Sequence, residues 1–93
     1  MTTTKKTATF IRTTTTGPAS QQRLYRLSPP MRSWAGVPHE YVIASAAFIA
    51  YEVRFFPSDE HGEIQSGIEL LGSMKNTVRH EDALLLAGYE VQP

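Results

Sequence analysis

Histidine and carboxylate side chains are the residues of this chain that could bind a metal ion. The three histidines, His39, His61 and His80, lie far apart, whereas paired histidine ligands are usually separated by about three to five residues. The acids that could join them are Asp59, Glu60 and Asp82. Because this spacing matches no metal-ligand signature, we predict that the protein holds no metal and needs no cofactor.

No arrangement typical of an enzyme occurs in the sequence. Residues 67–75 have the outline of a phosphate-binding loop, but such a loop needs a lysine directly after its second glycine, and here Ser73 and Met74 intervene. No serine lies in a Gly-x-Ser-x-Gly turn, and the chain has no cysteine to supply a thiolate. Asp59, Glu60 and Glu63 share a glycine turn, and three carboxylates on such a turn are more typical of a solvated hairpin end than of an acid–base pair. We therefore predict that the protein is not an enzyme.

Basic and aromatic residues in the first half of the chain could bind a partner. Arg23 and Arg26 flank Tyr25, and Arg32 lies two residues before Trp34. Arginines neutralise phosphates and aromatic rings stack on bases, so these residues could bind single-stranded nucleic acid. A surface tryptophan could instead anchor a protein partner. The structural alternative places Tyr25 in the core and pairs the arginines with acids at strand edges.

The charges are divided unevenly along the chain, although the net charge is zero. Residues 1–39 contain six of the nine bases and none of the nine acids. These bases are dispersed, whereas basic segments that bind nucleic acid usually have runs of about 5–8 residues. We therefore expect the two halves to neutralise each other within the fold, and we rank nucleic acid below protein as the partner.

The elements that position these residues belong to one small domain. Residues 1–6 are polar and lack apolar periodicity, so we predict a disordered N-terminal tail before a single domain over residues 7–93. β-branched residues predict a strand over 7–15, and alternation predicts a second strand over 23–28. The prolines that surround Trp34 predict a loop over 29–38.

Residues 40–50 are apolar at nearly every position and therefore fit either a strand or a helix. Strict alternation from Tyr51 to Phe55 favours a strand, which needs a partner, so we predict a hairpin with its first strand over 41–47. Pro57 would end the second strand. The alternative is a helix that begins at Pro38.

Residues 63–79 predict a short strand and an irregular connection. Glu63-Ile64-Gln65 follows a glycine turn and predicts a short strand. Glycines and turn-forming residues over 66–79 predict an irregular segment with Ile68 and Leu71 turned inward.

A short helix and a last strand are predicted at the C-terminus. Two acids oppose the positive end of the helix dipole if the helix begins near Arg79. Leu84, Leu85 and Ala87 would form its buried face, and Gly88 would end it in a left-handed conformation. A strand over 89–92 would lie at a sheet edge. The predicted fold class is α+β, a small mainly antiparallel β-sheet with one short C-terminal α-helix packed on a face.

Four blocks of sequence carry a family resemblance, and they are residues 56–64, 69–73, 80–84 and 87–91. In this order and spacing they resemble a group of small, uncharacterised proteins encoded by actinobacteria and their bacteriophages. The similarity also reaches Pro29-Pro30 and the strand at Tyr41. The resemblance implies a bacteriophage or prophage origin, and it carries over no catalytic residue.

The sequence as a whole favours a non-enzymatic protein-binding module, and the resemblance implies a host protein as its partner. The candidate partner-binding residues are Trp34, Arg32, Arg26 and Arg23. Exposed sheet edges would also permit a weak homodimer.

The N-terminus lacks the apolar stretch of a secretory signal, and the longest apolar run is shorter than the roughly 20 residues of a membrane helix. We therefore expect a cytoplasmic protein, in the host cytoplasm if phage-encoded, that does not enter a membrane. The alternative function is single-stranded nucleic-acid binding by the basic N-terminal half.

Overall fold

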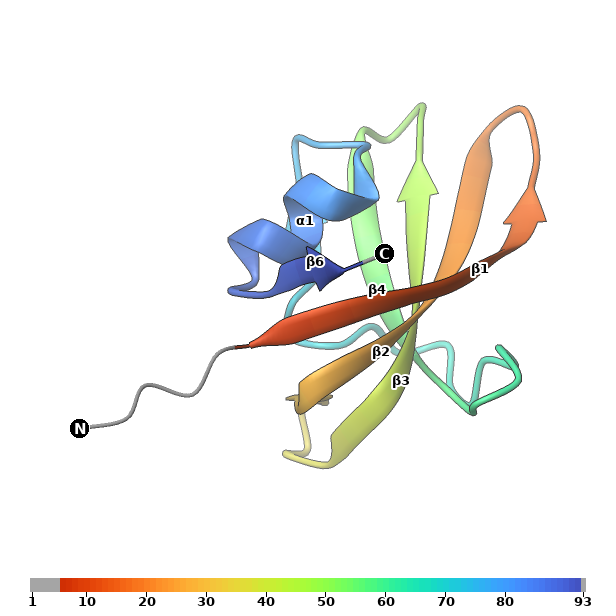
Figure 1. Cartoon of the computed structure of the whole chain (residues 1–93). Coiled ribbons are helices and arrows are strands. Elements are labelled where there is room, and N and C mark those ends of the chain that lie inside the picture. Colours follow the sequence, from red (N-terminus) through yellow and green to blue (C-terminus); the bar gives the residue numbers. More distant parts are fainter. Residues whose placement is uncertain (1–5, 93) are drawn as a thin grey trace.

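The computed structural model describes residues 6–92, which form a six-stranded β-sheet with one short helix on a face (Figure 1). The strand order across the sheet is β5-β4-β3-β2-β1-β6. The strands are β1 (Thr7–Thr16), β2 (Ser20–Arg32), β3 (Pro38–Ala47), β4 (Glu52–Ser58), β5 (Met74–Lys75) and β6 (Glu90–Gln92), and the helix is α1 (His80–Leu86). The predicted α+β class is confirmed at this level.

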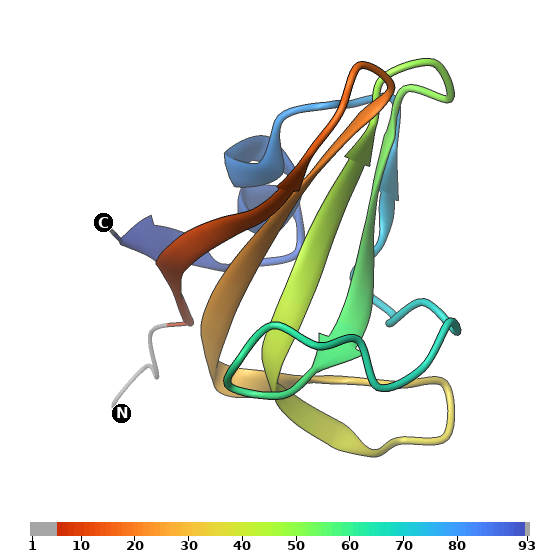
Figure 2. The same cartoon turned by 90° about the vertical axis from the view of Figure 1, so that its right-hand side faces the viewer.

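Strands β1 to β4 form a curled antiparallel meander. The register of β1 against β2 shifts between Phe10 and Arg12 and again between Thr13 and Thr15. Such irregularities bend a strand and increase its twist. As a result β1 runs obliquely across the other strands, and the sheet curls around the helix side (Figures 1 and 2).

The last strand, β6, pairs with β1 in the parallel direction, with Thr7 opposite Glu90 and Thr9 opposite Gln92. The sheet is therefore mixed, and the prediction of a mainly antiparallel sheet is wrong in this respect. A tight turn forces antiparallel pairing, but β6 is reached through α1, which crosses the face of the sheet and brings the chain to the outer edge of β1. Sequence patterns report strands and turns and not the direction of such a crossover.

Strand β2 is longer than predicted because it continues through two prolines to Arg32. The pairing of β2 with β3 is interrupted between Arg26 and Met31, and both prolines lie in this interval. Proline has no backbone N–H, but here its presence removes no hydrogen bond from the ladder between the two strands. The predicted loop over 29–38 is thereby reduced to residues 33–37.

The predicted hairpin is confirmed, and the helical alternative for residues 40–50 is wrong. Ala44 lies opposite Phe55, and both side chains are fully buried. β4 passes through Pro57 and ends one residue later. The strand predicted over 63–65 is reduced to one isolated bridge, which joins Ser58 and Ile64.

The main core lies between the sheet and α1. Its buried members are Ala8, Tyr25, Leu27, Met31, Val42, Ala44, Ala46, Val53, Phe55, Leu70, Ala83, Leu84 and Tyr89. The helix contributes Ala83 and Leu84, whereas Leu85 is exposed, contrary to the prediction. Successive helical residues point about 100° apart, so a helix that buries Leu84 against a sheet turns Leu85 away from it.

The connection over 66–73 also differs from the prediction, because Leu70 is buried while Ile68 and Leu71 are exposed. The backbone N–H of Leu70 donates to the carbonyl oxygen of Phe55 at 2.6 Å. This bond holds the segment alongside β4 with Leu70 turned inward. Leu71, the next residue along the chain, therefore points away from the core.

The face of the sheet opposite α1 is partly covered by the loop after β4 (Figure 2). Leu24 and Ile43 are fully buried outside the main core. Gly62 has a φ of +92° and lies against Leu24 and Thr14. A residue in this left-handed conformation lets the loop fold back onto the sheet, which favours glycine there.

Residues 1–5 of the predicted N-terminal tail lie outside the described residues. Lys6, the last residue of that predicted tail, contacts the C-terminal part of the domain. Its Nζ donates to the carbonyl oxygen of Ala87 at 3.3 Å and lies 4.6 Å from the centre of the Tyr89 ring. No helix within residues 6–92 has the length and apolar character needed to cross a membrane.

Candidate functional site

The four predicted partner-binding residues do not share one surface. Side chains alternate between the two faces of a strand. Tyr25 lies in the core that faces α1, so Arg23 lies on the same face and Arg26 on the opposite one. The arginine–tyrosine–arginine cluster suggested by the sequence is therefore divided by the sheet, and its tyrosine is buried.

Arg23 and Arg26 each form an ion pair with an acid from the second half of the chain. Arg23 Nη1 lies 3.2 Å from Glu81 Oε1 on α1, and the Arg23 guanidinium lies 5.7 Å from the centre of the Phe10 ring. Arg26 Nε lies 3.2 Å from Glu40 Oε1. These two pairs join the basic and acidic halves, which is the mutual neutralisation that the charge pattern favoured.

Arg32 and Trp34 lie together at the loop between β2 and β3. Arg32 Nη1 donates to the Gly36 carbonyl oxygen at 2.7 Å. Within the loop, the Ser33 N–H donates to the Val37 carbonyl oxygen at 2.9 Å, and the Val37 N–H donates to Ser33 Oγ at 3.2 Å. Arg32 is therefore a structural support of the loop that presents Trp34.

Trp34 is 72% exposed and lies beside an apolar groove of about 390 Å³. The residues that line this Trp34 groove are Ser33, Trp34, Ala35, Val37, His39, Pro57, Gln65, Ser66 and Ile68. None of them is an acid, a lysine or an arginine. Val37 and Ile68, which also line the groove, are exposed large hydrophobic residues, so Trp34 is one of three exposed apolar side chains at this groove.

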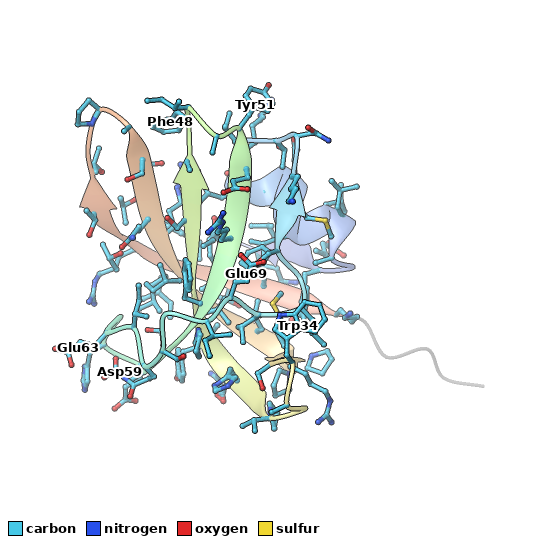
Figure 3. The ribbon with its side chains drawn as sticks, turned by 180° about the vertical axis from the view of Figure 1, so that it is seen from behind. Trp34, Phe48, Tyr51, Asp59, Glu63 and Glu69 are labelled. Atoms are coloured by element: carbon cyan, nitrogen blue, oxygen red, sulfur yellow. The ribbon has the colours of Figure 1, made fainter. Side chains whose placement is uncertain are left out.

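The residues considered for metal binding or acid–base chemistry are dispersed or have structural partners. Asp59 Oδ1 accepts hydrogen bonds from the N–H groups of His61 and Glu63, both at 2.9 Å. The bond from Glu63 contributes most to lowering the pKa of Asp59. Asp59 and Glu63 lie at a corner of the sheet well away from Glu69 (Figure 3). Within residues 6–92 no group of three histidine, aspartate or glutamate side chains is placed to hold a metal ion.

His80 is buried where α1 meets β2. Its Nε2 lies 2.9 Å from the carbonyl oxygen of Gln21. Burial is the main cause that lowers the pKa of His80, while the bond to Gln21 acts in the opposite direction. This histidine therefore joins two elements of the fold.

A second apolar surface, which the sequence reasoning missed, occupies the turn between β3 and β4. In this 48–51 tip, Phe48, Ile49 and Tyr51 are exposed, and Ile49 is 90% exposed. Turns are usually formed by glycine, proline and small polar residues. The apolar composition of Phe48-Ile49-Ala50-Tyr51 was the signal that could have identified this surface.

Comparison of the chain with protein-family models, curated proteins and solved structures found no match.

Proposed function

We propose that this protein is a non-enzymatic protein-binding module that receives apolar side chains of its partner in the Trp34 groove. The observation that carries the proposal is the exposed Trp34 ring beside an apolar groove whose lining contains no acid, lysine or arginine. Exposed apolar surface of this kind on a soluble domain is typical of an interaction site. The resemblance to phage-encoded proteins adds the expectation that the partner is a host protein.

The loop that carries Trp34 is suited to binding with little loss of conformational freedom. Four hydrogen bonds within residues 32–37 hold it closed, two between Ser33 and Val37, one from the Gly36 N–H to the Ser33 carbonyl oxygen and one from Arg32 to Gly36. Ordering a flexible loop on binding would cost free energy, and a loop that is already held avoids most of that cost. Tryptophan is among the residues that contribute most to binding at protein interfaces.

Single-stranded nucleic acid is the alternative partner, and the arrangement of charges favours it less. Arg23 and Arg26 lie on opposite faces of the sheet, and each is paired with a glutamate. A phosphate backbone that follows one face of the sheet can therefore reach only one of the two arginines, and it would have to displace the glutamate paired with that arginine.

A peptide selection tests the proposal. A displayed library of random linear peptides is selected against the wild-type chain, and labelled peptides are measured by fluorescence anisotropy. We expect sequences with paired aliphatic or aromatic anchors. Their affinity should fall at least about 30-fold in Trp34→Ala, which corresponds to the loss of about 2 kcal/mol at an interface hot spot.

The matched control is Leu85→Ser, because Leu85 is 66% exposed but lies on α1. It should leave peptide affinity unchanged. Peptides that bind Trp34→Ala as tightly as the wild type would contradict the proposal. A steeply salt-dependent affinity for oligothymidine that is lost in Arg23→Ala and Arg26→Ala would replace it with the alternative.

A further inference from the structure

The 48–51 tip is an apolar projection held in a fixed conformation. The Phe48 N–H donates to the Ala19 carbonyl oxygen at 2.9 Å, and the Tyr51 carbonyl oxygen accepts from the Asn76 N–H at 2.8 Å. Tyr51 has a φ of 55°, which is uncommon for a bulky residue and persists only where the surroundings impose it. The tip is therefore supported from both sides while Ile49 projects into solvent.

The tip and the Trp34 groove lie at opposite ends of the same strand. β3 runs from Pro38, directly after the groove loop, to Ala47, directly before the tip. Ten residues of strand span about 30 Å. Figure 3 shows Phe48 and Tyr51 at one end of the sheet and Trp34 at the other. The tip of one molecule therefore cannot reach the groove of the same molecule.

We infer that the 48–51 tip of one copy docks into the Trp34 groove of a second copy, so that the chain associates head to tail. This inference rests on the proposed function and names its partner as another copy of the same chain. The exposed side chains of the tip are apolar, and so is most of the groove surface, so the two can pack against each other and exclude water. Each molecule carries one of each.

The charges are compatible with this contact. The tip consists of Phe48-Ile49-Ala50-Tyr51 and has no charged side chain, and the groove lining contains no acid, lysine or arginine. Docking therefore buries no carboxylate, lysine or arginine side chain in the groove, whose burial without a partner would oppose the contact. The net charge of zero also leaves little long-range repulsion between copies.

The geometry of the contact determines the kind of assembly. Two different surfaces meet, so the interface is heterologous, and each added copy presents a new free tip and a new free groove. Such a contact produces an open chain or a closed ring, and the smallest ring is a dimer in which each tip occupies the groove of the other copy. A few side chains in one groove bury less than the roughly 1,200 Å² of standard interfaces, so the association should be weak and reversible.

Complementary variants test this inference by sedimentation equilibrium over a range of concentrations. Ile49→Ser removes the main side chain of the tip, and Ile68→Ser removes part of the groove. Both residues are exposed, at 90% and 68%, so the fold should be retained, which circular dichroism checks. We expect the wild-type mass to rise with concentration above that of a monomer, and each variant alone to associate less than the wild type and to stay near the monomer mass of 10.4 kDa.

The mixture of the two variants is the decisive sample. Ile68→Ser retains a tip and Ile49→Ser retains a groove, so an equimolar mixture should form a species that stops at the dimer mass. Leu85→Ser should associate as the wild type does. A wild type that remains monomeric, a wild-type association that neither Ile49→Ser nor Ile68→Ser weakens, or a mixture that stays monomeric would overturn the inference. If peptides nevertheless bind in a Trp34-dependent manner, only the identity of the partner is wrong and the proposed function stands.

Discussion

At the scale of single residues, His80 connects a buried contact to the pH dependence of stability. Its pKa is lowered in the folded state, chiefly by burial, whereas in the unfolded chain it should titrate near its ordinary value of about 6.5. The unfolded state therefore binds the additional proton when the pH falls below that value. The contribution of His80 to the free energy of unfolding should be fully present above about pH 6.5. It should be lost as the pH falls from that value toward the pKa of His80 in the folded state.

We expect the free energy of unfolding, measured by urea titration, to decrease between about pH 7.5 and pH 5.5 in the wild type. His80→Gln keeps a donor for the Gln21 carbonyl oxygen but cannot be protonated, so its stability should depend less on pH in this range. His61→Gln, at an exposed histidine, is the control and should keep the wild-type dependence. An equal dependence in His80→Gln and the wild type would show that this contact does not cause it.

At the scale of elements, the orientation of α1 determines which leucine stabilises the domain. Leu84 is fully buried in the core, and Leu85 is 66% exposed. We expect Leu84→Ala to lower the free energy of unfolding by about 2–4 kcal/mol because it leaves a cavity under the helix. Leu85→Ala should change it by less than about 0.5 kcal/mol. Chemical denaturation of the two variants side by side makes the comparison, and equal losses would mean that α1 does not pack through Leu84.

Several elements could be predicted from the sequence, and the differences have identifiable causes. The strand that became β1 and the β3–β4 hairpin were predicted because β-branched residues and alternation mark a half-buried sheet. β2 was predicted too short because prolines usually exclude a strand, and here they fall where the ladder is already interrupted. The direction of β6 depends on the path of the chain through α1, which local patterns do not report.

At the scale of the whole molecule, the candidate site could be predicted only in part. Trp34 was identified because flanking prolines indicate an exposed loop, and it is exposed. The Trp34 groove was not, because it is formed by Pro57, Gln65, Ser66 and Ile68 from beyond β3 as well as by the loop itself. Arg23 and Arg26 were grouped by their proximity in sequence, although alternation along a strand places an odd and an even position on opposite faces.

Binding of a protein segment in the Trp34 groove can be followed in a single amide NMR spectrum. Trp34 is the only tryptophan in the chain, so its indole Nε1–H gives a single NMR signal. We predict that a peptide from the selection shifts this signal together with the backbone amides of 33–37 and 65–68, equally at low and moderate salt, because apolar contacts depend weakly on ions. Oligothymidine at moderate salt should leave these signals unmoved. A shift of the Trp34 indole signal and of the Arg23 and Arg26 signals with oligothymidine, and no shift with peptide, would contradict protein binding in the groove.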